Sequence, residues 1–327
     1  MKIIEPDATI IHESNVYKQV ERIGRLCYKS EGNISRASCY SFVENLVEHK
    51  HFAMLEHGHV HFIVTLGGKQ DRLPDSFIKI PYVVWDELPL NDDGEGLTKN
   101  YLVTVSLSHL YKDTDCSPLM RDLGIAHSRG CYTSEDYIIS MIKLDQLGIQ
   151  KVARWYKSKY GHPKYIKIFT SMLMRHAFIS VKFTCDRGVS HELVRHRCSV
   201  AQESTRYCNY ARDKFGNELT FIRPSNMDAE DIANVWEPEC ESIEDRYIYL
   251  VKKRNVAPQI ARSILPNSLK TEVVLTMSLQ QWDHFFNVRL WGTTGKPHPD
   301  MVVVAQIAHD KIVKFNDNLF GVLNHNK

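Results

Sequence analysis

The sequence contains no run of about 18 apolar residues that could cross a membrane, and its start, "MKIIEPDATI", has no basic segment followed by an apolar one. Its net charge is only +2, without blocks of like charge, so no global field favours a nucleic-acid polyanion. None of the eight cysteines lies in a C-x-x-C pair, which argues against zinc knuckles and redox motifs of that type. We therefore expect a cytoplasmic protein with free thiols that binds neither membranes nor nucleic acids.

The composition of the 327 residues, 43% hydrophobic and 24% charged, is typical of a folded protein. The N-terminal part predicts two helices between Val16 and Glu48, with "SEGN" as an interruption, and then a strand in "HGHVHFIVTLGG". Alternation puts His57, His59 and His61 on one face of that strand. Without a fourth ligand in a recognisable frame, a structural role is favoured over a metal site.

The stretch from about 66 to 170 carries no catalytic cluster and reads as an inserted segment of ordinary elements. It contains "LPDSFIKIPYVVW", the acidic turn "LNDDGEG" and the alternating "YLVTVSLS". We expect a helix pair through "IISMIKL" and "VARWYKSKY".

The C-terminal half returns to strand and helix patterns. "HAFISVKFTCDRG" predicts a strand, and "GVSHELVRH" predicts the start of a helix with Ser190 as its N-cap. "APQIARSILP" predicts a helix that stops near Pro266, followed by an extended segment and a second helix with Arg289 near its end. The apolar face of that second helix comprises Trp282, Phe285, Phe286 and Val288.

The densest group of polar side chains lies in "SHELVRHRCSVAQESTRYCNY", residues 190 to 210. A zinc protease motif fails because His191 and His196 are five residues apart, about 140° around a helix at roughly 100° per residue. A covalent nucleophile is disfavoured because neither Ser204 nor Cys198 lies in a G-x-S-x-G elbow.

An anion site fits the same stretch better. Arginine forks bind phosphate bidentately, and Ser or Thr hydroxyls add neutral donors. The stretch supplies this inventory, with two tyrosines beside it: Arg195, Arg197, Ser204, Thr205, Arg206, Tyr207 and Tyr210. The chemistry alone indicates a phosphate-bearing small molecule such as a nucleotide.

The segment "RHRCSVAQESTRY" resembles the signature of the flavin-dependent thymidylate synthases, in which R-H-R is followed by a short spacer and S-x-R-Y. The flanking "DRGVSHELVRHR" and "TRYCNYARDKFGNELTFIRP" are similar to the longer branch of that family. "RLCYKS" and "HFAMLEHG" resemble its N-terminal flavin-side segments, and "ARSILP", "TMSLQQWDHFFNVRL" and "HPDM" resemble its C-terminal half-site.

The resemblance implies one α+β catalytic domain over residues 1–327, with a mixed or antiparallel sheet and an insertion at about 66–170. It implies a homotetramer whose active sites combine subunits, so Arg206 and Arg289 need not meet within one chain. It also implies that FAD, NADPH and methylene-tetrahydrofolate convert dUMP to dTMP, with the flavin carrying the hydride and without a covalent protein nucleophile.

The resemblance also assigns site residues. Arg289 is the residue most important to the chemistry, because its permanent charge would stabilise negative charge that develops at N3 of uracil. The positions that correspond to dUMP ligands are Glu192, Arg195, Gln202, Glu203, Ser204, Thr205, Arg206, Arg262 and Arg289. The positions that correspond to FAD ligands are His51, Ala53, Glu56, Arg195, His196, Arg197, Gln202, Ser278, Gln280 and His284. No metal ligand is implied.

Three positions depart from the family pattern. The spacer from Arg197 to Ser204 has six residues where the family usually has seven, which implies a tighter turn at Cys198. Ala53 stands where relatives commonly have Thr or Ser, and Gln280 replaces an arginine found in some relatives. These departures make cofactor affinity the property most exposed to change.

Two other functions compete with this interpretation. One is a nucleotide-binding homologue that keeps the fold but lacks flavin and activity. The short spacer and Ala53 are the features that support this alternative. RNA binding through the Arg and Tyr cluster would need an extended basic and aromatic surface, and the near-neutral chain argues against it.

Overall fold

Two antiparallel sheets form the framework of the structure, a computed structural model that describes residues 1–68, 84–88, 98–112, 129–133, 137–144, 163–206, 209–211 and 216–316. The first sheet has the order β2-β8-β11-β9, and every neighbouring pair is antiparallel. Its strands are β2 (Asp7–Ile11), β8 (Phe178–Asp186), β11 (Lys270–Ser278) and β9 (Ser199–Gln202). The long pair β8 and β11 forms the centre, and both strands lead directly into segments of the predicted site.

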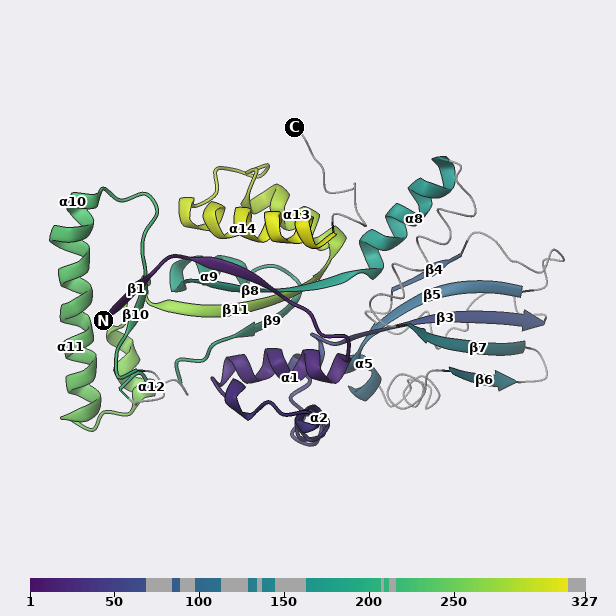
Figure 1. Cartoon of the computed structure of the whole chain (residues 1–327), viewed down its shortest axis with the longest axis horizontal. Coiled ribbons are helices and arrows are strands. Elements are labelled where there is room, and N and C mark those ends of the chain that lie inside the picture. Colours follow the sequence, from purple (N-terminus) through teal and green to yellow (C-terminus); the bar gives the residue numbers. More distant parts are fainter. Residues whose placement is uncertain are drawn as a thin grey trace.

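The second sheet has the order β4-β5-β3-β7-β6 and extends to one side of the first sheet (Figure 1). Its central strand is β3 (His59–Gly68). The other strands come from the range predicted as an insertion: β4 (Val84–Glu87), β5 (Thr98–Ser106), β6 (Arg129–Thr133) and β7 (Tyr137–Leu144). The inserted range therefore extends the chain's own strand β3 into a sheet. A short parallel pair, β1 (Lys2–Ile4) and β10 (Thr220–Ile222), joins the N-terminus to a later segment.

Helices cover both faces of the four-stranded sheet. On one face lie α13 (Leu279–Arg289) and α14 (Pro299–Asn316), and on the other lie α1 (Val16–Cys27) and α2 (Ser38–Glu48) (Figure 1). Phe183 of β8 and Trp282 of α13 are fully buried in the core between the sheet and the first pair of helices. The Trp282 indole donates to the backbone oxygen of Ile179, so the one polar atom of this large side chain is satisfied.

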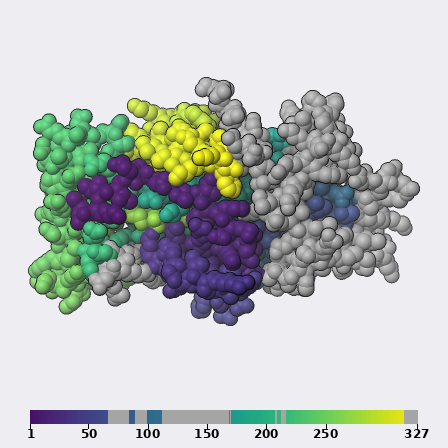
Figure 2. Space-filling model, viewed as in Figure 1, coloured from purple at the N-terminus to yellow at the C-terminus, as the bar shows by residue number. Residues whose placement is uncertain are grey.

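The remaining helices are shorter or peripheral. Around the sheets lie η1 (Glu31–Asn33), α3 (Phe52–Leu55), α5 (Leu107–Lys112), α8 (Pro163–His176) and α9 (Arg187–Leu193). At the far end, α10 (Ala229–Asp231), η3 (Ile232–Trp236) and α11 (Glu237–Lys252) are followed by α12 (Pro258–Ala261) and η4 (Arg262–Ile264). Figure 2 shows the N-terminal segment crossing the surface between α14 and the α1–α2 pair, where Lys311 donates to Asp7 at 2.8 Å. No helix among the described residues is long and apolar enough to cross a membrane.

The α+β class and the antiparallel sheets confirm the predicted fold class. The helices predicted between Val16 and Glu48, the strands predicted in "HGHVHFIVTLGG" and "HAFISVKFTCDRG", and the extended segment and helix predicted after Pro266 are present. The helix predicted through "IISMIKL" is wrong, because this segment is strand β7. Its isoleucines favour a strand, and β7 pairs on both sides, with β3 and β6. The second helix of that pair, "VARWYKSKY", and the turn "LNDDGEG" lie outside the described residues.

Candidate active site

The first part of the site motif begins where β8 passes into α9. The prediction of Ser190 as N-cap is wrong: the cap is Asp186, whose carboxylate accepts the backbone N–H of Val189 at 2.8 Å. Asp186 has the extended backbone that an N-cap requires, whereas Ser190 lies inside the helix. The Ser190 hydroxyl donates to the backbone oxygen of Arg187 and accepts from Gln202 at 3.0 Å. Ser190 therefore ties the first segment of the site to the second.

The R-H-R triplet lies after the helix. Helix α9 ends at Leu193, so Glu192 is helical but Arg195 is not. The chain instead turns, with the N–H of Arg195 bonded to the oxygen of Glu192. The turn leaves the side chains of Arg195 and Arg197 exposed, whereas His196 is half-buried.

Arg289, the last residue of α13, reaches this turn. Its Nη1 donates to the Glu192 carboxylate at 2.6 Å, and its Nε donates to Nε2 of His196 at 3.0 Å. The Arg289 side chain is 18% exposed, and two residues of the motif bond its guanidinium. This bonding uses the fork geometry of arginine, in which neighbouring N–H groups point in fixed directions.

His196 acts as an acceptor in this group because it is neutral. Burial, with smaller contributions from the charge of Arg289 and the neighbouring His284, lowers the pKa of His196 to about 4. A neutral imidazole can present an unprotonated nitrogen to the Arg289 N–H. The ring of Phe285, with its centre 4.9 Å from that of His196, provides part of the apolar surroundings.

The second part of the motif begins on β9, which pairs with β11, and then leaves the sheet. Gln202 contacts Ser190, as described above. The Glu203 carboxylate is buried and accepts from Lys270 at 2.9 Å, with Lys29 at 3.5 Å. Glu203 is therefore engaged in ion pairs of its own chain, which its sequence position did not indicate.

The Ser204–Arg206 turn contacts an arginine that is distant in the sequence, Arg262. The Thr205 hydroxyl accepts from Nη1 of Arg262 at 2.9 Å, so two predicted dUMP residues from segments 57 positions apart are in contact. The Ser204 hydroxyl accepts the backbone N–H of Arg206 at 3.4 Å. Arg206 and Arg262 are exposed at the surface. Their charges and the nearby hydroxyls form the anion-binding inventory that the sequence predicted.

A cluster of lysines and glutamates supports this turn and was not predicted. Lys29 contacts Glu272, and Glu272 also lies 3.3 Å from Lys182 and 3.4 Å from Lys270. Burial alone would raise the pKa of Glu272, but the three lysines overcome it and lower the pKa to about 2. Lys29 belongs to "RLCYKS", so the family resemblance pointed to the segment but not to this ion-pair role.

Four of the ten predicted flavin residues line a cavity of about 820 Å³. Glu56, Arg197, Ser278 and Gln280 all line it, although they belong to three separate segments of the chain. The turn at Cys198, which the short spacer left in question, also lies on its wall. Gln281 holds the turn in place by donating to the backbone oxygen of Arg197 at 2.9 Å.

Other predicted flavin residues lie elsewhere. His51 precedes α3 and Ala53 lies within it, both exposed, and neither is among the described residues that line the cavity. His284 stands beside His196, with ring centres 6.5 Å apart, rather than on the cavity wall. Sequence reasoning missed His59 and Phe178, whose rings stack with centres 3.6 Å apart on the wall of the cavity.

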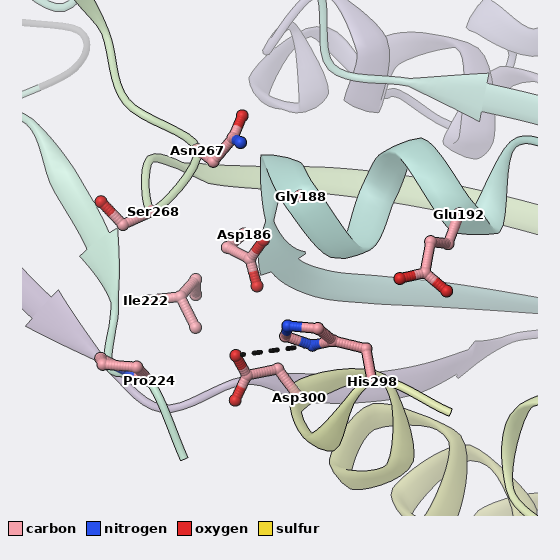
Figure 3. Close-up of a pocket in the computed structure, with 9 residues that line it drawn as sticks. All are labelled: Asp186, Gly188, Glu192, Ile222, Pro224, Asn267, Ser268, His298 and Asp300. Carbon is pink, nitrogen blue, oxygen red and sulfur yellow. Dashed lines mark ion pairs between the residues drawn. The ribbon is translucent and has the colours of Figure 1, made fainter. Parts of the chain in front are cut away.

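A smaller pocket of about 310 Å³ lies beside α9 (Figure 3). Glu192 lines it from the helix, together with Asp186, His298 and Asp300, and the last two residues form an ion pair at 3.9 Å. Burial and the neighbouring Asp300 raise the pKa of Asp186. The carboxylates make this pocket unfavourable for a phosphate group, which favours the Thr205–Arg262 side for that group.

The three histidines near β3 are each engaged in the core. His57 bonds the Thr276 hydroxyl at 2.7 Å, His61 bonds Thr104 at 2.8 Å, and His59 stacks on Phe178. In the described parts of the chain, no group of three or more His, Cys, Asp or Glu side chains could hold a metal ion.

A profile of the family described as "Thymidylate synthase complementing protein" matches residues 122–314. The chain is 31% identical over 134 residues to a flavin-dependent thymidylate synthase of Pyrococcus furiosus, covering 40% of this chain and 50% of that protein. It is 35% identical over 105 residues to the Geobacter sulfurreducens protein of the same name, covering 32% and 43%. The chain thus spans about half the length, or less, of the curated relatives it matches.

Among solved structures, the chain is similar to a flavin-dependent thymidylate synthase of Helicobacter pylori complexed with FAD and dUMP. The TM-score is 0.38 at 19% identity, and the match covers 54% of this chain and 93% of that one.

Proposed function

Because the chain belongs to the thymidylate synthase complementing protein family, we propose that it catalyses the reductive methylation of dUMP to dTMP. Methylene-tetrahydrofolate is the one-carbon donor, and NADPH is the reductant by way of FAD. One observation carries this proposal: Glu56, Arg197, Ser278 and Gln280, which the sequence predicts to contact flavin, line a single cavity.

The cavity fits a flavin in size and in chemistry. Its volume of about 820 Å³ lies within the roughly 300–1,000 Å³ of most ligand sites. The stacked His59 and Phe178 supply a flat wall against which a ring system can pack. Arg197 and Gln280 add donors to its wall, with which the carbonyl and ring-nitrogen acceptors of a flavin can bond. When bound, FAD supplies the hydride that completes the methyl group at C5 of uracil.

The chain's own part in the reaction is to bind and polarise the pyrimidine. Arg289 is permanently charged, and Glu192 and His196 hold its guanidinium in place before any substrate arrives. A charge fixed in this way stabilises negative charge that develops at N3 of uracil without the cost of reorganisation.

The nucleotide phosphate binds at the Ser204–Arg206 turn. Thr205 and Arg262 are already in contact there, and Ser204 and Arg206 stand beside them. The Arg289 group lies at another part of the motif, around Glu192 and His196. The proposed homotetramer would join the two groups by placing residues of different subunits around one dUMP, as the resemblance implies.

Neither candidate nucleophile is needed in this reaction. Burial raises the pKa of Cys198 to about 12, so its thiol stays protonated at neutral pH. The Ser204 hydroxyl lies at the phosphate-binding turn, where it accepts the N–H of Arg206 and can donate to an anion.

The test is direct. The visible spectrum of the purified protein is recorded, and NADPH, methylene-tetrahydrofolate and dUMP are then added together and singly omitted. A yellow protein that forms dTMP only in the complete mixture supports the proposal. A colourless protein that takes up no added FAD and still binds dUMP would favour the alternative, a nucleotide-binding homologue that has lost flavin and activity.

A further inference from the structure

The 820 Å³ cavity has two kinds of wall. One is built from the segments that resemble the family, and the other comes from the inserted range and from α8, which begins within that range and ends beyond it. The inserted range contributes Val84, Ser106 and His109, and Arg175 follows from the last turn of α8. The inserted range therefore forms part of the wall of the proposed cofactor site.

Residues outside the cavity wall anchor the Arg175 side chain. Its Nη2 donates to Asp86 on β4, and Asp86 also bonds Nε2 of His176 at 3.0 Å. Thr104 fixes the other nitrogen of His176 at 2.7 Å. Asp86 is not part of the cavity wall, so this network anchors the guanidinium while Arg175 itself lines the cavity.

Arg175 still has bonding capacity toward a ligand. Its Nε is buried and has no hydrogen-bond partner among the described residues. An unpaired buried N–H costs free energy, so an acceptor that reaches it is bound favourably. The neighbouring Ser106 and His109 are bonded to each other at 2.7 Å and add polar groups to the same wall.

The charge of the lining favours an anion. The wall includes two arginines, Arg175 and Arg197, and Glu56 is its one carboxylate among the described residues. Guanidinium groups bind phosphate oxygens through charge-assisted, often bidentate bonds. Arg197 belongs to the predicted flavin triplet, so an anionic part of the same cofactor would extend toward the inserted wall.

We propose that Arg175, with the Ser106–His109 pair, binds the diphosphate group of the flavin dinucleotide, so that the wall formed by α8 and the inserted range makes this chain selective for FAD over flavins without a diphosphate. This inference rests on the proposed function, because it takes the cavity to be the flavin site. It predicts that a variant without Arg175 loses its preference for FAD, which binding measurements can detect without turnover.

The experiment compares the affinities of the full-length apoprotein for FAD and for riboflavin by quenching of flavin fluorescence. Arg175→Gln should weaken FAD binding roughly 10- to 100-fold, the range for the loss of a charge-assisted hydrogen bond, and leave riboflavin binding unchanged. Arg223→Gln is the matched control, because Arg223 is equally exposed (40% against 42%) and ion-paired, but does not line the cavity.

Arg175→Gln alone leaves Asp86 without its arginine, which could harm folding. The double variant Asp86→Asn, Arg175→Gln removes both charges and should show the same selective loss of FAD. Equal losses for FAD and riboflavin in the double variant would overturn the diphosphate contact and leave the proposed function standing. A raised KM for NADPH with unchanged FAD affinity would overturn it as well, since the contact would then belong to the reductant. A wild-type protein that binds neither flavin would overturn the proposed function together with this inference.

Discussion

Arg289 and Glu192 lie 2.6 Å apart, although 97 positions separate them in the sequence. The antiparallel pairing of β8 with β11 explains this contact. Helix α13 starts after Ser278, which pairs with Phe178 at the first residue of β8, and runs back along the sheet. Its last residue, Arg289, therefore lies near the end of β8, where α9 begins and places Glu192. Glu192 and Arg289 meet because the strands that precede α9 and α13, β8 and β11, are antiparallel neighbours in the sheet.

Replacing Arg289 by Ala should abolish most turnover and leave flavin bound. The loss of one preorganised charged donor typically lowers kcat by roughly 10²- to 10³-fold. Arg289→Lys keeps the charge but loses the fork that reaches Glu192 and His196, so it should be only partly active. Formation of dTMP and the flavin absorbance are measured on the same samples. Unchanged dTMP formation in Arg289→Ala would remove the catalytic role.

Replacing Glu192 tests whether the position of Arg289 matters and not only its charge. Glu192→Ala removes the acceptor that holds the guanidinium and should lower kcat by roughly tenfold, in line with the loss of one hydrogen bond to a charged group. Glu192→Gln retains an acceptor at the same place and should restore most of the rate. A kcat that falls equally in both variants would mean that the negative charge, and not the positioning, is what the site requires.

The fold class and the main elements could be predicted because they leave strong periodic signals. Buried and less buried residues alternate along much of β8, β11 has the apolar run Val273–Leu275 at its centre, and α13 has buried Trp282 and Phe286 at helical spacing. Strand β7 was mistaken for a helix because a short isoleucine-rich run fits either structure, and only its pairing with β3 and β6 decides.

From its chemistry alone, the site could be predicted only where its residues lie in one segment, as in the anion-binding inventory of residues 195–206. Arg262, which reaches Thr205 from another segment, was assigned by the family resemblance. Contacts between distant segments leave no local pattern, so the Lys29–Glu272 pair, 243 positions apart, could not be found. The same holds for the wall that Arg175 and the inserted strands give the cavity.

Ser204→Ala should weaken dUMP binding without abolishing turnover. The hydroxyl is one neutral donor among several groups at the proposed phosphate site, and such a bond contributes about 1 kcal/mol, or roughly fivefold in affinity. Binding is followed by calorimetry with dUMP and activity by dTMP formation. Complete inactivity with normal dUMP affinity would instead revive Ser204 as a nucleophile.

Lys29→Met should destabilise the protein, because Glu203 and Glu272 would lose a cation in a place where both carboxylates are largely buried. We expect a loss of about 2 kcal/mol in the free energy of unfolding, below the usual cost of breaking a buried pair because Lys182 and Lys270 remain. Lys50→Met is a matched control. Both lysines have a left-handed backbone, with φ of 49° and 57°, but Lys50 is exposed. Equal effects of the two substitutions in urea unfolding would show that backbone conformation, and not the ion pairs, is responsible.

The stability of the fold should decrease between pH 6.5 and pH 4 because of its buried neutral histidines. Burial lowers the pKa of His57 to about 4 and that of His59 to about 3, against an ordinary value of 6.5. In this range the unfolded chain binds protons that the folded protein does not, so each histidine favours folding above pH 6.5 and this contribution is lost as the pH falls toward the folded pKa. One such group gives a slope of at most about 1.4 kcal/mol per pH unit. His57→Gln, which can keep the bond to Thr276, should flatten the pH dependence of urea unfolding, whereas His49→Gln at an exposed position should not. A slope in His57→Gln equal to that of the wild type would show that His57 does not titrate between the folded and unfolded states in this range.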